Sequence, residues 1–236
     1  MFDQAKFQTI LNAYKQVFLN QQWPDEKFKW IAVKHFQDHW DIEATDFLTM
    51  FLDATQKTDN LLTAFHYYPQ GMIKEFAQAD PEATRAMFIS LFDESKDLYE
   101  RIIRFIADSD SLREKYDPGS WNQHYQNMNS ITTYLWLRYP DKYYIYKYSE
   151  LRSISKSLES SFLPTKGTRP GNISGFHKLY DALRTLISAD TELTGMLQSA
   201  LTPDCYPDKR HNTLTIDFGY FTSRTYKKDV SNESDW

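Results

Sequence analysis

Residues 134–150 read YLWLRYPDKYYIYKYSE, the densest run of aromatic and basic residues in the chain. The residues up to Arg138 have the character of a helix end. Pro140 and Asp141 break that helix, because proline lacks an N–H group and disfavours helical geometry in the residue before it. Residues 142–148 then alternate in the way that is typical of a β-strand. Successive side chains of a strand point to opposite faces, which groups Tyr144, Tyr146 and Tyr148 against Tyr143, Ile145 and Lys147. Which of these faces is buried stays open.

The residues before this segment predict helices almost throughout. Apolar residues recur at helical spacing from Phe7 to Phe18, and a second helix begins at Pro24. Asp80 and Pro81 form a strong helix start, because aspartate caps free N–H groups and proline fits the first helical position. Further helices are predicted over residues 43–57, 72–79, 81–91 and 95–115, which makes the N-terminal half all-α.

The residues after the segment add a second predicted strand. Residues 213–218, TLTIDF, alternate like a strand, and residues 220–226 extend it or pair with it. Three helices lie between, over residues 151–160, 176–187 and 192–201. We therefore expect an α+β fold that is predominantly α-helical, with a multi-helix N-terminal half and a small β-sheet in the C-terminal half. The predicted division is a helical subdomain over 1–118, an α+β subdomain over 119–226 and a polar tail or linker start over 227–236, with a single domain over 1–226 as the alternative.

The composition excludes several classes of protein. The chain has 41% hydrophobic and 25% charged residues, which is ordinary for a globular domain. No apolar run approaches the roughly 18 residues of a membrane span, so we expect no membrane partner. The single cysteine, Cys205, excludes an intrachain disulfide and fits a reducing cytoplasm. Because the formal net charge is −5, nucleic-acid binding would require a local basic patch.

Two pairs of side chains are candidates for metal binding or for nucleophilic chemistry. His35 and His39 have the i, i+4 spacing of a zinc-binding pair, but Phe36 follows the first histidine where the catalytic motif has glutamate. No third ligand is evident nearby, so helix packing is the expected role and no metal is predicted. Cys205 precedes His211 by six residues. Proximity in sequence does not position a base, so we expect a buried structural thiol.

Nuclease and nucleotide-hydrolysis motifs are also missing from the sequence. A metal-dependent nuclease needs an aspartate, here Asp141 or Asp208, followed by an acidic residue and a lysine two positions apart. Residues 150–152 have arginine in place of that lysine, and residues 217–219 have no lysine. Residues 166–168, KGT, lack the glycine that a phosphate-binding loop requires. The sequence therefore predicts a chain that is not an enzyme and holds no cofactor.

Four segments resemble the N-terminal region of McrB-like proteins, the AAA+ motor subunits of modification-dependent restriction systems. They are FKWIAVKHFQDHWDI (28–42), DPEATRAMFISLFDE (80–94), residues 134–150, and CYPDKRHNTLTIDFGYFTSR (205–224). The resemblance covers nearly the whole chain and implies a DNA-binding target-recognition module of a restriction or phage-defence system. It also implies that a motor domain or subunit and a separate nuclease subunit are partners. We expect no motor in this chain, and whether base modification is sensed stays open.

The residues predicted to contact nucleic acid combine rings, cations and polar side chains. Rings stack on exposed bases, cations neutralise phosphates, and polar side chains read base edges. The predicted residues are Arg138, Lys142, Tyr143, Tyr146, Lys147, Tyr148, Arg152, Lys166, Arg169, Asn122 and His124. The alternative is a protein-interaction or assembly module of a defence system with no nucleic-acid binding. The two differ in whether the basic residues of 138–169 form one exposed face.

Overall fold

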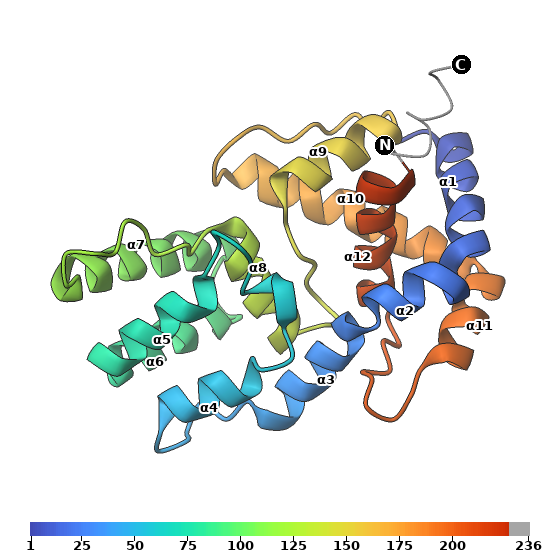
Figure 1. Cartoon of the computed structure of the whole chain (residues 1–236). Helices are drawn as coiled ribbons and strands as arrows, with labels where there is room; N and C mark the ends of the chain where they lie inside the picture. Colours follow the sequence, from blue (N-terminus) through green and yellow to red (C-terminus); the bar gives the residue numbers. More distant parts are fainter. Residues whose placement is uncertain (227–236) are drawn as a thin grey trace.

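The computed structural model describes residues 1–226, and over this range the chain consists of helices and connecting segments (Figure 1). The helices are α1 (Gln4–Val17), α2 (Trp23–Glu26), α3 (Phe28–His39), α4 (Phe47–Ala54), α5 (Pro69–Ala79), α6 (Pro81–Phe92), α7 (Leu98–Tyr116), α8 (Met128–Arg138), α9 (Tyr148–Ser157), α10 (Pro170–Ala189), α11 (Thr191–Ala200) and α12 (Asn212–Phe221). Short helical turns are η1 (Phe18–Gln22), η2 (Asp59–Leu61) and η3 (Thr222–Tyr226). The predicted tail at 227–236 lies outside the described residues.

The helices form two groups that meet along α3 and the segment between α8 and α9. Helices α4 to α8 lie on the left of Figure 1, and α1 with α9 to α12 lies on the right. Helix α1 packs against α12 and η3, so the N-terminal helix belongs to the same group as the C-terminal helices. Helix α3 packs against α4 and α8 of the first group, and its Lys29 pairs with Asp217 on α12 of the second, so α3 joins the groups. One continuous hydrophobic core runs through both.

Residues 213–218 were predicted as a strand, and this prediction is wrong: they lie in helix α12. The buried carboxylate of Asp208 accepts hydrogen bonds from the N–H groups of Thr213 (3.2 Å) and Leu214 (2.8 Å). It thereby supplies the partners that the first turn of a helix requires. The helix packs against α1, α9 and α10 and is buried on nearly every side. A helix buried on all sides has no polar face, so the alternation in its sequence carried no information about its structure.

The segment 143–147 is extended, but it does not pair with a strand. Within residues 1–226, the β-type pairing is an isolated bridge between Ala64 and Tyr67. The N–H of Tyr146 donates to the Thr132 hydroxyl (2.9 Å), which satisfies it without a sheet. The predicted α+β fold with a small C-terminal sheet is therefore wrong, because the strand that would have paired with this segment is helix α12. The described chain is all-α.

Several predicted helix ends are confirmed. The Asp80 side chain accepts from the N–H of Ala83 (3.0 Å), and Pro81 is the first residue of α6. Helix α8 ends at Arg138, as predicted from Pro140. None of the helices in residues 1–226 combines the length and the apolar character that crossing a bilayer requires.

Candidate functional site at the junction of the two helix groups

A groove of about 370 Å³ opens where the two helix groups meet. Its lining comes from α2 and α3, from η2 and the turn after it, from the start of α8 and the segment between α8 and α9, and from α9, α10, α12 and η3. We call it the junction groove, and its lining residues are Glu26, Phe28, Lys29, Asn60, Leu61, Ala64, Asn129, Ile145, Lys147, Glu150, Tyr180, Ile216, Tyr220 and Arg224. Its volume lies within the range of small-molecule sites, roughly 300–1,000 Å³.

A buried ion cluster forms the inner wall of the junction groove. The Lys29 ammonium lies 2.6 Å from Asp217 Oδ1 and 2.8 Å from Glu26 Oε2. The Lys29 side chain is 4% exposed and the Asp217 side chain 0%. Asp217 also accepts hydrogen bonds from the Tyr14 hydroxyl (2.6 Å) and the Gln22 amide (3.1 Å). Because every buried charge here has a partner, the cluster joins α1, η1, α3 and α12 into one unit.

The surroundings of the cluster set the protonation of its members. Burial opposes the charged form of Lys29, but the carboxylates of Asp217 and Glu26 outweigh it and raise the pKa of the ammonium. Burial likewise raises the pKa of Glu26, against the lowering effect of Lys29. Burial, together with the negative charge of Asp217, raises the pKa of the Tyr14 hydroxyl well above its usual range. Lys29 is therefore a fixed positive charge, and Tyr14 remains a hydrogen-bond donor.

A second ion cluster lies at the outer rim of the junction groove. Glu150 accepts from Lys147 (2.8 Å) and from two nitrogens of Arg224, Nε and Nη2, each at 3.2 Å. The side chains of Lys147 and Arg224 are 43% and 46% exposed, so their remaining N–H groups face solvent. These three residues carry one net positive charge. The rim therefore offers donors that an anionic ligand can engage.

A smaller hollow of about 360 Å³ adjoins the junction groove, because Asn129 and Lys147 line both. We call it the loop hollow, and its other lining residues are Asn127, Met128, Tyr146, Tyr148, Ser149, Gly167 and Thr168. The Tyr146 hydroxyl is buried and has no hydrogen-bond partner among residues 1–226. The loop hollow extends the groove toward the exposed loop that carries Lys166 and Arg169.

The structure brings some of the predicted nucleic-acid residues together. Lys147, Tyr146 and Tyr148 line the loop hollow, and Lys166 and Arg169 flank its residues Gly167 and Thr168 in the chain. The Lys166 and Arg169 side chains are exposed. These five of the predicted residues therefore lie at or next to the loop hollow.

The other basic and aromatic residues of the predicted set lie elsewhere. Lys142 pairs with Glu94, which follows α6, at 2.6 Å. Tyr143 is buried, and its hydroxyl donates to Glu94 (2.7 Å) and accepts from Arg101 (2.7 Å). The Arg138 guanidinium lies 5.0 Å from the ring centroid of Tyr139, and Arg152 donates to the Pro164 carbonyl (3.4 Å). These side chains therefore contact protein groups.

Asn122 and His124 lie between α7 and α8, outside the lining of both hollows. Asn122 is exposed. His124 Nε2 lies 3.2 Å from the Asp110 carboxylate, and its Nδ1 accepts from the N–H of Gln126 (2.9 Å). Burial lowers the pKa of His124, although Asp110 favours its charged form. Its contacts hold the connection between two helices.

The side chains that were candidates for catalysis make hydrogen bonds or ion pairs within the fold. Cys205 is buried, with Sγ 3.3 Å from the Thr202 hydroxyl, whereas His211 Nδ1 contacts the Ser188 hydroxyl (2.9 Å). Asp208 caps α12, and Asp217 binds Lys29. His211 therefore contacts Ser188 and is not positioned as a general base for the Cys205 thiol.

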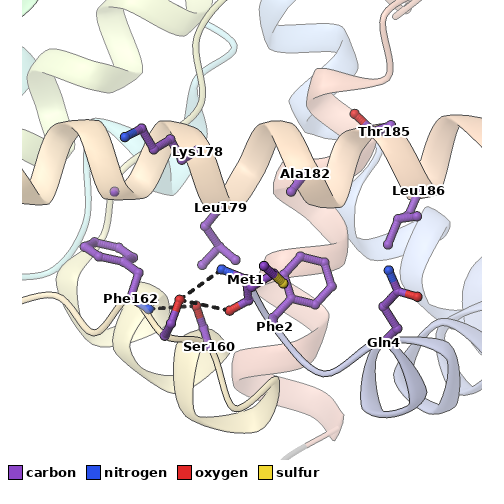
Figure 2. Close-up of a pocket in the computed structure, with 12 residues that line it drawn as sticks. Met1, Phe2, Gln4, Ser160, Phe162, Lys178, Leu179, Ala182, Thr185 and Leu186 are labelled. Atoms are coloured by element: carbon purple, nitrogen blue, oxygen red, sulfur yellow. Dashed lines mark hydrogen bonds between the residues drawn. The ribbon is translucent and has the colours of Figure 1, made fainter.

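Figure 2 shows a further cavity of about 420 Å³ between the first residues of the chain, residues 160–162 and α10. It is mainly apolar, with Phe2, Phe162 and Leu179 around it and Lys178 at its edge. A Cβ atom on Gly175 would lie 2.2 Å from the Phe162 ring, so the glycine allows this ring to lie against α10. The cavity lacks the clustered charges of the junction groove. Lys178, exposed and outside that groove, therefore provides a control for charge.

Sequence analysis missed the inner cluster of the junction groove, although a signal was present. Lys29 interrupts an aromatic and apolar run between Phe28 and Trp30, and Asp217 stands between Ile216 and Phe218. Such a charge is a candidate for a buried, paired group, although Lys147 shows the same pattern between two tyrosines and is 43% exposed. The pairing itself spans 188 residues, so no local pattern predicts it.

Comparison of the chain with protein-family models, with curated proteins and with solved structures found no match in any of the three.

Proposed function

We propose that this chain is the DNA-binding target-recognition part of an McrB-like restriction or phage-defence system, that it acts in the cytoplasm and that it is itself non-catalytic. One observation supports this most strongly. Three of the four segments that resemble McrB-like proteins line the junction groove: they contribute Phe28 and Lys29; Ile145, Lys147 and Glu150; and Ile216, Tyr220 and Arg224. A motor domain or subunit and a nuclease subunit would then act on the DNA that this part selects.

The chemistry of the junction groove suits a nucleotide that has left the base stack. Enzymes and readers of single bases hold the base by stacking on aromatic rings and by hydrogen bonds to its edge. Phe28 and Tyr220 supply rings, and Asn60 and Asn129 supply amides that both donate and accept. The 370 Å³ volume admits one nucleoside, not a duplex.

We assign the phosphate contacts to the outer rim of the junction groove and to the exposed loop beside the loop hollow. Lys147 and Arg224 stand at the groove, and Lys166 and Arg169 stand beside the loop hollow. Such contacts supply sequence-independent affinity, and each makes binding weaker as salt rises. The chain has a formal net charge of −5, so the rest of the surface is acidic overall. We therefore expect DNA to contact the surface only at these four basic residues.

Fluorescence anisotropy tests the proposal with matched single-stranded and double-stranded DNA, with and without modified cytosine, over a salt series. We expect affinity to fall with salt, and Lys166→Ala and Arg169→Ala each to reduce the salt slope by about one. Asn60→Ala, an exposed groove residue, should weaken binding without changing that slope. A preference for the modified probe would identify base sensing as part of the function.

Lys178→Ala is the matched control, because it removes an exposed positive charge outside the groove. It should leave both affinity and salt slope unchanged. Absence of binding at low salt, or equal weakening by Lys178→Ala and Arg169→Ala, would contradict the proposal.

A protein-interaction module is a second candidate, and an exposed aromatic loop favours it. Phe65 is 86% exposed and Tyr68 is 46% exposed in the loop between η2 and α5. Exposed aromatic residues are typical of protein interfaces. Pull-down with the wild-type chain and with Phe65→Ser tests this candidate. A partner lost with Phe65→Ser, from a chain that binds no DNA, would favour it over the first.

A further inference from the structure

His35 and His39 on α3 come together with Asp53 on α4. The two histidines are one helical turn apart and share one face of α3. Their imidazole rings are stacked, with centroids 4.0 Å apart. One possible ligand atom from each histidine and from the Asp53 carboxylate lies within 4.8 Å of the other two. Helix α4 thus supplies the third ligand that the sequence near the histidine pair does not show.

The hydrogen bonds of the two rings determine which nitrogens are free. His35 Nε2 lies 2.8 Å from the backbone carbonyl oxygen of Asp53, and His39 Nδ1 lies 2.8 Å from that of His35. A carbonyl oxygen only accepts, so both of these nitrogens carry protons. The lone pairs are therefore on His35 Nδ1 and His39 Nε2. Histidines that bind metals commonly donate their other N–H in this way, which orients the ring and increases the basicity of the ligand nitrogen.

We propose that His35, His39 and Asp53 form a binding site for one divalent transition-metal ion, with Zn²⁺ as the best-suited species. Two imidazoles and one carboxylate are ligands that Zn²⁺ takes at a four-coordinate site, with water at the fourth position. Ca²⁺ and Mg²⁺ prefer sites made of oxygen ligands. His39 and Asp53 are exposed and His35 is half-buried, so the ion can enter directly from solvent.

A bound ion would join α3 to α4, and the chain at the start of α3 and beyond α4 lines the junction groove. Helix α3 begins with the groove residues Phe28 and Lys29, and the chain after α4 carries the groove residues Asn60 and Leu61. An ion that binds the folded state and not the unfolded one stabilises the fold by mass action. The ion therefore fixes α3 against α4, whether or not the groove binds DNA.

Titration of the chain with Co²⁺, followed by competition with Zn²⁺, tests the site directly. Co²⁺ bound at a four-coordinate site gives visible absorption bands, and we expect one ion per chain that Zn²⁺ displaces. The melting temperature should rise on adding Zn²⁺ and not on adding Mg²⁺. We expect His39→Ala and Asp53→Asn each to weaken binding at least tenfold.

His66→Ala is the control, because His66 is exposed and lies outside the cluster. It should bind Co²⁺ as the wild type does. His39 is exposed, so circular dichroism of metal-free His39→Ala should match the wild type. Absence of the absorption bands, or binding by His39→Ala and Asp53→Asn equal to the wild type, would overturn the proposal.

Discussion

Two ion pairs of this protein have the same nitrogen–oxygen distance, 2.6 Å, and opposite surroundings. Lys29 and Asp217 are 4% and 0% exposed, whereas Lys142 and Glu94 are 55% and 33% exposed. Water screens the second pair and leaves both charges solvated when the pair breaks. The first pair has no such alternative, because either charge alone would remain buried. Burial, and not distance, therefore decides what each pair contributes.

Replacing Lys29 should have the largest effect on stability. Lys29→Met leaves the Asp217 carboxylate buried without a cation, and we expect a loss of about 3–5 kcal/mol in the free energy of unfolding. Urea unfolding followed by circular dichroism measures it. A loss below about 1 kcal/mol, the size expected of a surface pair, would remove the distinction between the two pairs.

Asp208 provides a third case beside the two ion pairs, because it is a buried carboxyl group without a cationic partner in residues 1–226. Burial raises its pKa to about 7, although the N–H groups of Leu214 and Thr213 and the Trp30 indole favour the charged form. A carboxyl whose pKa is raised on folding stabilises the fold below its unfolded pKa of 3.8, and this contribution is lost as pH rises through 7.

The free energy of unfolding should therefore fall as pH rises from 5 to 8 more steeply in the wild type than in Asp208→Asn. From about 1.4 kcal/mol per unit of pKa shift, the difference is about 2–3 kcal/mol. Urea unfolding at a series of pH values measures both slopes. Parallel slopes would mean that Asp208 does not titrate in this interval.

Tyr14→Phe tests how much the hydrogen bond from the Tyr14 hydroxyl to Asp217 contributes to the stability that the inner cluster provides. The substitution removes the donor 2.6 Å from Asp217 Oδ2 and leaves Lys29 in place. A hydrogen bond to a charged group contributes about 1.5–3 kcal/mol, and we expect a loss near the lower end. Urea unfolding of Tyr14→Phe and Lys29→Met side by side ranks the two contributions. A loss equal to that of Lys29→Met would contradict the central role of the cation.

Lys142→Met should have the smallest effect. The pair with Glu94 is exposed, and such pairs contribute about 0–1 kcal/mol. Raising the salt concentration should reduce even this difference, whereas it should leave the effect of Lys29→Met nearly unchanged. Thermal melts of both variants at low and high salt make the comparison. An effect of Lys142→Met above about 2 kcal/mol would show that exposure does not separate the pairs.

Local sequence signals predicted most of the helices, but some of their ends only to within several residues, since α10 begins at Pro170 and not at residue 176. The Asp80 cap with Pro81, and the end of α8 before Pro140, depend on groups within a few residues of each other. The strand predictions failed where the deciding contact was remote. Residues 213–218 lie in α12, which is buried among helices from both ends of the chain, and no local pattern predicts that burial.

The candidate site was predictable only in part. Lys147 and Tyr148 belong to the aromatic and basic stretch that the sequence singles out, and both line the loop hollow. Lys29 and Asp217 do not stand out as a pair, because 188 residues separate them. Asp53 was also missed as a partner of His35 and His39, because it lies on the next helix and the spacing of residues does not show how two helices pack.

Local sequence patterns establish the predominance of helices, the helix ends at Asp80 and Arg138, and the apolar residues available for a core. These follow from short-range sterics, capping and periodicity. Packing between distant segments decides that residues 143–147 stay unpaired, that residues 213–218 are helical, and which charges meet at the junction groove. The physical reason is that backbone and charged groups must find partners wherever burial removes water, and those partners come from distant parts of the chain.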